Sequence, residues 1–98
     1  MDNISAIFNG DVKTPETYLL QIAQRERDAR KKMKLSREAL SKKSGVSFGS
    51  LKRFEESGNI SLTSLVKLAV ALDCSGDLDA LFRPKKAASI EDIINGEN

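Results

Sequence analysis

The stretch from residue 34 to residue 58, KLSREALSKKSGVSFGSLKRFEESG, constrains the fold more than any other part of the chain. Ser36 and Ser47 can each cap the start of a short amphipathic helix, since a serine hydroxyl accepts hydrogen bonds from the free backbone amides there. Gly45 suits the left-handed position that ends one helix and begins a tight turn, and Gly58 marks the end of the second helix. The two helices are predicted over 37–43 and 48–56. The pattern therefore predicts a pair of helices joined by a short turn.

A longer helix is predicted before this pair. Thr14, Pro15 and Glu16 form a helix-start signature. Threonine can cap free amides, proline tolerates the first helical position, and a carboxylate suits the positive end of a helix. This helix should run over 15–33, where apolar residues recur at helical spacing and leave most Arg and Lys side chains facing outward.

Two more helices are predicted after the pair, over 62–72 and 77–82. Apolar residues cover more than one face of the first, which Ser61 can cap, so we expect it to be the buried spine of the core. In the second, the residues expected to close the core are Leu78, Leu81 and Phe82. Proline disfavours helix in the residue before it, so Arg83-Pro84 should end this helix.

At 98 residues the chain is short enough to form one small domain. The predicted fold class is all-α, a compact five-helix bundle with a central helix-turn-helix. We expect residues 14–82 to form this domain, residues 1–13 an N-terminal arm, and residues 83–98 a C-terminal tail.

Charge is distributed unevenly along the chain. Residues 23 to 53 carry eleven Lys and Arg against three acidic residues, a net charge of +8. Residues 54 to 98 carry four cations against eight anions, a net charge of −4, although the whole chain sums to only +2. A basic half favours a polyanion as a partner. Its overlap with the turn motif favours this interpretation over an ordinary solvated helix face.

The composition excludes several kinds of site. With no His and one Cys, neither a His-based general acid/base site nor a Cys/His zinc site can form within one chain. We therefore expect no enzymatic activity, no metal and no cofactor. Cys74 is expected to be a small apolar residue in a reducing cytoplasm rather than a nucleophile or redox sensor. The longest apolar run, residues 68–72, is five residues, so no membrane span is expected.

A helix-turn-helix lays its second helix in the major groove of DNA, while its first crosses the backbone. Ser36 and Arg37 stand at the N-terminus of the first helix, where free amides, the helix dipole and a cation favour a phosphate. Contacts of this kind position a protein without reading sequence.

The second helix of the pair can be divided by angle, at about 100° per residue. Leu51 and Phe54 define its core side, and the positions facing away from the core are Gly49, Lys52 and Arg53. Arg53 suits a bidentate contact with guanine, and Lys52 can reach a base or a phosphate. Phe48 lies between the two sides. It would either close the core or contact thymine methyl groups, and we favour the groove.

Residues 17 to 82, about two thirds of the chain, resemble the Cro/CI-type repressor domain family, also called XRE. The resemblance lies in KLSREALSKKSGVS, in SLKRFE at 50 to 55, in the short loop at Gly58, and in SLTSLVKLAVALDC leading into DALF. It implies a lambda repressor-like bundle of five helices that usually binds operators as a dimer.

By position, the resemblance implies roles for individual residues. The implied phosphate contacts come from Ser36, Arg37 and Ser50, and the implied base readers are among Ser47, Phe48, Gly49 and Arg53. An ion pair between Arg30 and Glu55 is also implied. The chain departs from the family pattern at Arg37, where many members carry Gln, and at Ser41, which replaces a small Ala facing the turn.

The leading hypothesis is a sequence-specific transcription regulator, a repressor that binds double-stranded DNA at an inverted repeat as a homodimer. Its dimer surface is left open among the 77–82 helix, Ile90–Ile94 and Ile4–Phe8. An alternative is suggested by residues 54–82 with the acidic, isoleucine-bearing tail. They look like the DNA-binding antitoxins that accompany HipA-type kinase toxins, which repress their own operon and also bind the toxin. A third interpretation is a helical adaptor with no nucleic-acid role.

Overall fold

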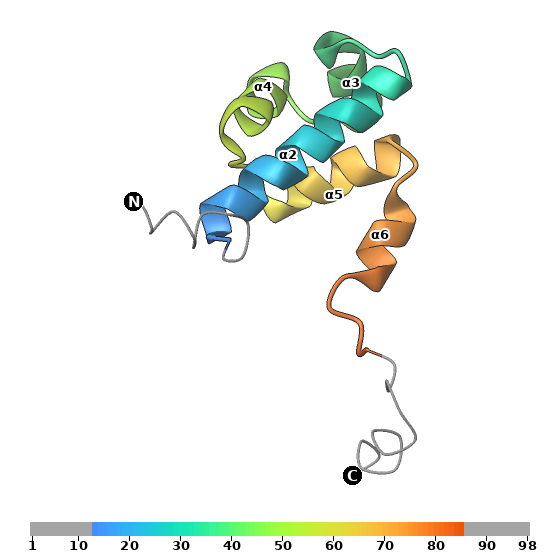
Figure 1. Cartoon of the computed structure of the whole chain (residues 1–98). Helices are drawn as coiled ribbons and strands as arrows, with labels where there is room; N and C mark the ends of the chain where they lie inside the picture. Colours follow the sequence, from blue (N-terminus) through green and yellow to red (C-terminus); the bar gives the residue numbers. More distant parts are fainter. Residues whose placement is uncertain (1–12, 86–98) are drawn as a thin grey trace, which may run out of the picture.

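The computed structural model describes residues 13–85, which form five α-helices and no β-strand (Figure 1). The helices are α2 (Pro15–Lys32), α3 (Arg37–Ser44), α4 (Phe48–Ser57), α5 (Leu62–Ala71) and α6 (Ser75–Ala80). The predicted all-α class with five helices and a central helix-turn-helix is confirmed. The predicted arm up to residue 12, residues 86–98 of the predicted tail, and the dimer segments Ile4–Phe8 and Ile90–Ile94 lie outside the described residues.

Hydroxyl side chains start four of the helices, as the sequence predicts. The capping residues are Thr14, Ser36, Ser47 and Ser61, whose side-chain oxygens accept hydrogen bonds at 3.0 to 3.2 Å from the backbone amide three residues on. Gly45 and Gly58 end α3 and α4 in the left-handed conformation, with φ of 82° and 86°. Local capping chemistry therefore sets the boundaries of the central pair.

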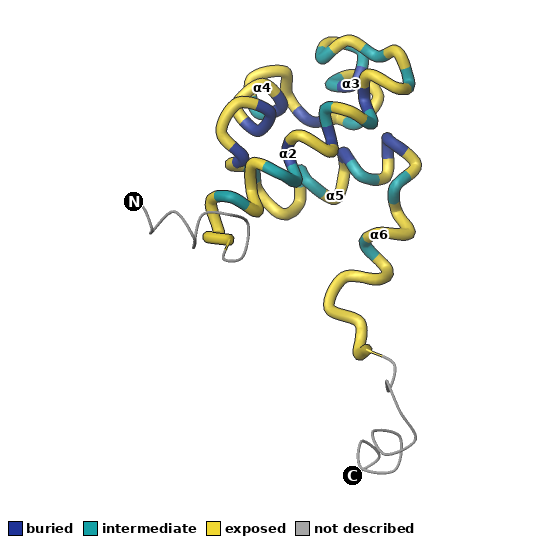
Figure 2. The backbone as a smooth tube through the Cα atoms, in the orientation of Figure 1, coloured by how far each residue is buried: buried dark blue, intermediate teal, exposed yellow. Residues whose placement is uncertain are grey.

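One core holds the motif against the rest of the domain. Its largest fully buried side chains are Leu40 of α3, Leu51 and Phe54 of α4, and Leu68 of α5. Ala23 adds a buried position from α2. Figure 2 shows the buried segments gathering where α2, α3, α4 and α5 meet. The orientation of α4 is thus fixed by apolar contacts that also involve the helices on either side of the pair in sequence.

The outer face of α5 differs from the prediction of a fully buried spine. Leu68 is fully buried, but Leu62, Val66 and Val70 are 68 %, 37 % and 56 % exposed. These three residues are four apart, so they share one side of the helix, and the described residues leave that side open. The apolar residues on this side of α5 therefore form part of the protein surface and are not part of the core.

The position of α6 also corrects the prediction. It spans Ser75–Ala80 instead of 77–82, and its apolar end does not close the core. Leu78 is half-buried, whereas Leu81 and Phe82 are 56 % and 95 % exposed. The helix ends early because Leu81 is extended and Phe82 has a φ of 60°. In addition, α6 extends away from α3 and α4, so its end does not reach the buried cluster (Figure 1).

Candidate nucleic-acid interface

Two serine side chains close the turn between α3 and α4. Ser41 Oγ donates to the Val46 carbonyl at 2.6 Å, and Ser44 Oγ accepts from the Val46 amide at 3.0 Å. Val46 itself is buried in the core. At position 41, where the family pattern has a small Ala, the hydroxyl therefore adds a hydrogen bond across the turn.

The second helix of the motif, α4, turns its apolar side inward and its cationic side outward. Leu51 and Phe54 are fully buried, whereas Gly49, Lys52 and Arg53 are exposed. A Cβ added at Gly49 would meet nothing within 4 Å. The side that the sequence analysis assigns to a DNA groove is thus unoccupied by the described part of the chain, and a duplex could approach the backbone at Gly49 closely.

The start of α4 presents a phenyl ring and two linked hydroxyls. Phe48 is 42 % exposed, so it does not close the core. Ser47 Oγ accepts from the Ser50 amide at 3.1 Å and donates to Ser50 Oγ at 2.9 Å. Ser47 is exposed and Ser50 is half-buried. These two hydroxyls are therefore held in place by the cap before any ligand is present.

A polar hollow of about 190 Å³ adjoins the outer side of α4. It is lined by Ser50, Arg53, Asn59, Ile60, Ser61 and Ser64. The N-terminus of α5, capped by Ser61, also opens here. A helix N-terminus beside a guanidinium favours negative charge, so this hollow suits a backbone phosphate next to any base that Arg53 contacts.

Arg37 differs from a freely extended phosphate-binding side chain. It is the first residue of α3, directly after the cap Ser36, and it is half-buried. Its Nε donates to Glu55 Oε1 at 2.9 Å. Within residues 13–85 the other side-chain nitrogens of Arg37 make no hydrogen bond. The guanidinium of Arg37 is thus held through Nε, and its two terminal nitrogens can still donate to a phosphate.

Glu55 gathers two arginines in the protein interior. Arg30 donates from Nε to Oε2 at 2.8 Å and from Nη2 to Oε1 at 2.9 Å, and its Nη1 donates to the Leu35 carbonyl at 2.9 Å. The Glu55 side chain is fully buried. Burial favours its neutral form, but hydrogen bonds from Arg30, Glu26 and Arg37 outweigh burial and lower the pKa of Glu55 to about 2. This Arg30–Glu55–Arg37 cluster joins α2, α3 and α4.

Glu26 is a buried acid that the sequence analysis did not single out. Burial first, and then contact with the Glu55 carboxylate, raises the pKa of Glu26 to about 8. The signal that could have found it is its spacing. Ala23, Glu26 and Arg30 are three and four residues apart, so they share one side of α2, and all three are buried.

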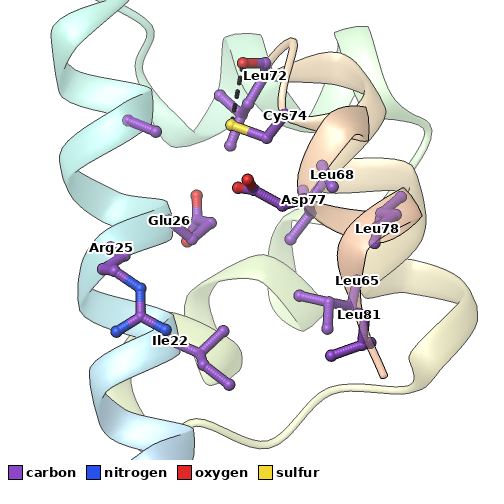
Figure 3. Close-up of a pocket in the computed structure, with 12 residues that line it drawn as sticks. Ile22, Arg25, Glu26, Leu65, Leu68, Leu72, Cys74, Asp77, Leu78 and Leu81 are labelled. Carbon is purple, nitrogen blue, oxygen red and sulfur yellow. Dashed lines mark hydrogen bonds between the residues drawn. The ribbon is translucent and has the colours of Figure 1, made fainter. Parts of the chain in front are cut away.

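An apolar cavity of about 280 Å³ lies between α2, α5 and α6 (Figure 3). Ile22, Leu65 and Leu78 are among its lining residues, and Glu26 and Asp77 approach it from two sides. Within residues 13–85 no three metal-binding side chains gather into one site. None of the helices there has the length and apolarity needed to cross a membrane.

Comparison with known families bears on this interface. A family model described as helix-turn-helix matches residues 27–78, more than half of the chain. The chain therefore belongs to the helix-turn-helix family of the Cro/CI, or XRE, type, as its sequence indicates. Membership of this DNA-binding family makes the protein a DNA-binding regulator in the general sense. A search of curated proteins found no match.

Proposed function

We propose that this protein is a sequence-specific transcriptional repressor that binds an inverted-repeat operator as a homodimer. The observation that carries the proposal is the exposed cationic side of α4, where Lys52 and Arg53 point away from a core that fully buries Leu51 and Phe54. A second helix presented in this way can lie in the major groove. The family match supports the same role.

The residues proposed to read bases lie at the start and along the outer side of α4. They are Ser47, Phe48, Gly49, Lys52 and Arg53. The guanidinium of Arg53 suits guanine, and the exposed ring of Phe48 suits a thymine methyl group. The proposed phosphate contacts come from Ser36, Arg37 and Ser50, which belong to the capped N-termini of α3 and α4 and set the register of the protein on the duplex.

We propose a homodimer because two-fold symmetry allows one protein to bind two short half-sites at once. Two recognition helices about 34 Å apart would contact major grooves one helical turn apart. Exposed apolar residues on α5 and just after α6 supply surface for a protein contact, and the most exposed of them are Leu62 and Phe82. Exposed apolar patches on small domains commonly mark such contacts.

A second candidate function uses the same apolar surface for a different protein. In this alternative the chain is an antitoxin that represses its own operon and also binds a HipA-type kinase toxin. The exposed side of α5 and the end of α6 would contact the toxin, leaving α4 free for DNA. Purification of the native protein distinguishes the two, since a stable complex with the product of an adjacent gene favours the antitoxin and a homodimer alone favours the simple repressor.

Selection of binding sites from random duplexes tests the proposal. We expect enrichment of an inverted repeat whose half-sites are centred about 10 base pairs apart. The proposal is overturned if a folded, purified protein enriches no sequence at moderate salt. Enrichment of single half-sites without a symmetric partner would retain DNA reading but exclude the dimer.

A further inference from the structure

Glu26 has no place on the proposed DNA surface, yet it lies against the carboxylate that anchors Arg37. The residue is only 8 % exposed. Neither of its carboxyl oxygens has a hydrogen-bond partner among the described residues, and the Glu55 carboxylate acts on it from α4. An isolated buried carboxylate is strongly disfavoured. The surroundings of Glu26 therefore favour its neutral form.

The geometry of Glu55 connects this interior group to the surface. Glu55 Oε1 accepts from Arg30 Nη2 and from Arg37 Nε, both at 2.9 Å. Arg37 follows the cap Ser36, where a phosphate contact is proposed. Any shift of the Glu55 carboxylate therefore moves the edge by which Arg37 is held. Arg30 and Glu26 are the two groups of α2 that fix that carboxylate from the interior.

We propose that Glu26 is a positioning residue for DNA binding, which acts through Glu55 to hold the Arg37 guanidinium at the N-terminus of α3. The inference rests on the proposed function. A neutral Glu26 leaves Glu55 as the single negative charge between two arginines. An ionised Glu26 adds a second carboxylate that repels Glu55 and attracts Arg37 toward the interior, away from a phosphate.

Several charged groups face Glu26 from the helices around it. They are Arg30 of α2, Arg37 of α3 and Glu55 of α4, while Arg25 and Asp77 line the same cavity as Glu26. Glu26 changes its charge between about pH 7 and about pH 9. Its pKa is raised to about 8, mainly by burial and then by the nearby Glu55 carboxylate. Glu55, whose pKa is lowered to about 2, stays ionised throughout this range. A pH profile therefore reports on Glu26 within the cluster.

The test measures DNA affinity by fluorescence anisotropy over a range of salt at about pH 7 and about pH 9. The probe is a labelled duplex that carries the selected operator. For the natural protein we expect the higher pH to remove one phosphate contact from each protomer of the dimer. That lowers the salt slope by about two units and weakens binding about sixtyfold at about 0.1 M salt. Glu26→Gln is neutral at both pH values and its amide can donate to Glu55, so it should keep the same slope and affinity throughout.

Glu16→Gln is the matched control, because Glu16 is an exposed acid in the first turn of the same helix. It should follow the natural protein. Thermal unfolding monitors the fold and gives a second readout. The folded natural protein binds the Glu26 proton more tightly than the unfolded chain. Its free energy of unfolding should therefore fall as pH rises from about 5 to about 8, and Glu26→Gln should lack that fall.

The outcomes test the positioning role of Glu26 and the proposed repressor function separately. Equal pH profiles of DNA binding for the natural protein and Glu26→Gln would overturn the positioning role and leave the repressor proposal intact. Weaker binding by Glu26→Gln at both pH values with an unchanged salt slope would also overturn it, because that pattern indicates a general structural role. A folded protein that binds no duplex at about pH 7 would overturn the proposed function itself and the positioning role with it.

Discussion

Replacing Glu55 by Gln should destabilise the domain more than any other single change of charge in the α2–α4 region. Glu55→Gln keeps the shape of the side chain but removes its charge. Arg30, whose side chain is only 8 % exposed, would then lose the carboxylate that accepts two of its hydrogen bonds. Arg37, 21 % exposed at its side chain, would also lose its anionic partner.

The size of the effect follows from burial. Removing one partner of a buried ion pair costs about 3 to 5 kcal/mol, and the partial exposure of Arg37 places this case near the lower value. Domains have a free energy of unfolding of about 0.05 to 0.15 kcal/mol per residue, or about 4 to 11 kcal/mol for residues 13–85. A loss of about 3 kcal/mol corresponds to a fall in Tm of at least about 12 °C for a domain of this size.

Thermal and urea unfolding of the purified chain, followed by circular dichroism, measures this loss. Glu56→Gln provides the matched control, because Glu56 is the next residue in the chain and is exposed. Its free energy of unfolding should change by less than about 0.5 kcal/mol. If Glu55→Gln and Glu56→Gln unfold at the same temperature, the reasoning from the buried cluster is refuted.

Four further substitutions test the DNA surface and the two glycine positions. Arg53→Ala should relax base preference at one operator position and weaken specific binding by about 1 to 3 kcal/mol, whereas Arg37→Ala should weaken all duplexes alike and lower the salt slope by about one per protomer. Equal effects of the two on operator and random DNA, measured by anisotropy, would contradict the assignment of base reading to Arg53. Gly58→Ala should lose about 2 kcal/mol or more in urea unfolding, because φ is 86° and a Cβ would lie 2.8 Å from Leu19 Cβ. Gly76→Ala, where a Cβ meets nothing within 4 Å, should be neutral or gain up to about 1 kcal/mol, and equal losses at both glycines would refute the steric argument.

The parts of the fold that sequence predicts well are those with local causes. Serine caps and left-handed glycines act within a few residues, so the limits of α3 and α4 follow from Ser36, Gly45, Ser47 and Gly58. The inward side of α4 follows from the spacing of its apolar residues. Helical spacing alone thus places the cationic residues of that helix on the outside.

The features that sequence does not predict depend on contacts between distant segments. Periodicity does not show which side of a helix its neighbours will cover, so it does not predict that Val66 is exposed or that Phe82 stays outside the core. Glu26 occurs in the charged run QRERDARKK, where each acid reads as solvated. Its burial depends on where α4 places Glu55, which lies 29 residues further along the chain.

The central claim is that the exposed side of α4 contacts DNA, and amide chemical-shift mapping of the isotope-labelled chain with operator duplex tests it most directly. The account predicts that the largest shifts fall on residues 47–53, with a second group at Ser36 and Arg37. Shifts confined to other surfaces, with residues 47–53 unchanged at saturating duplex, would contradict it.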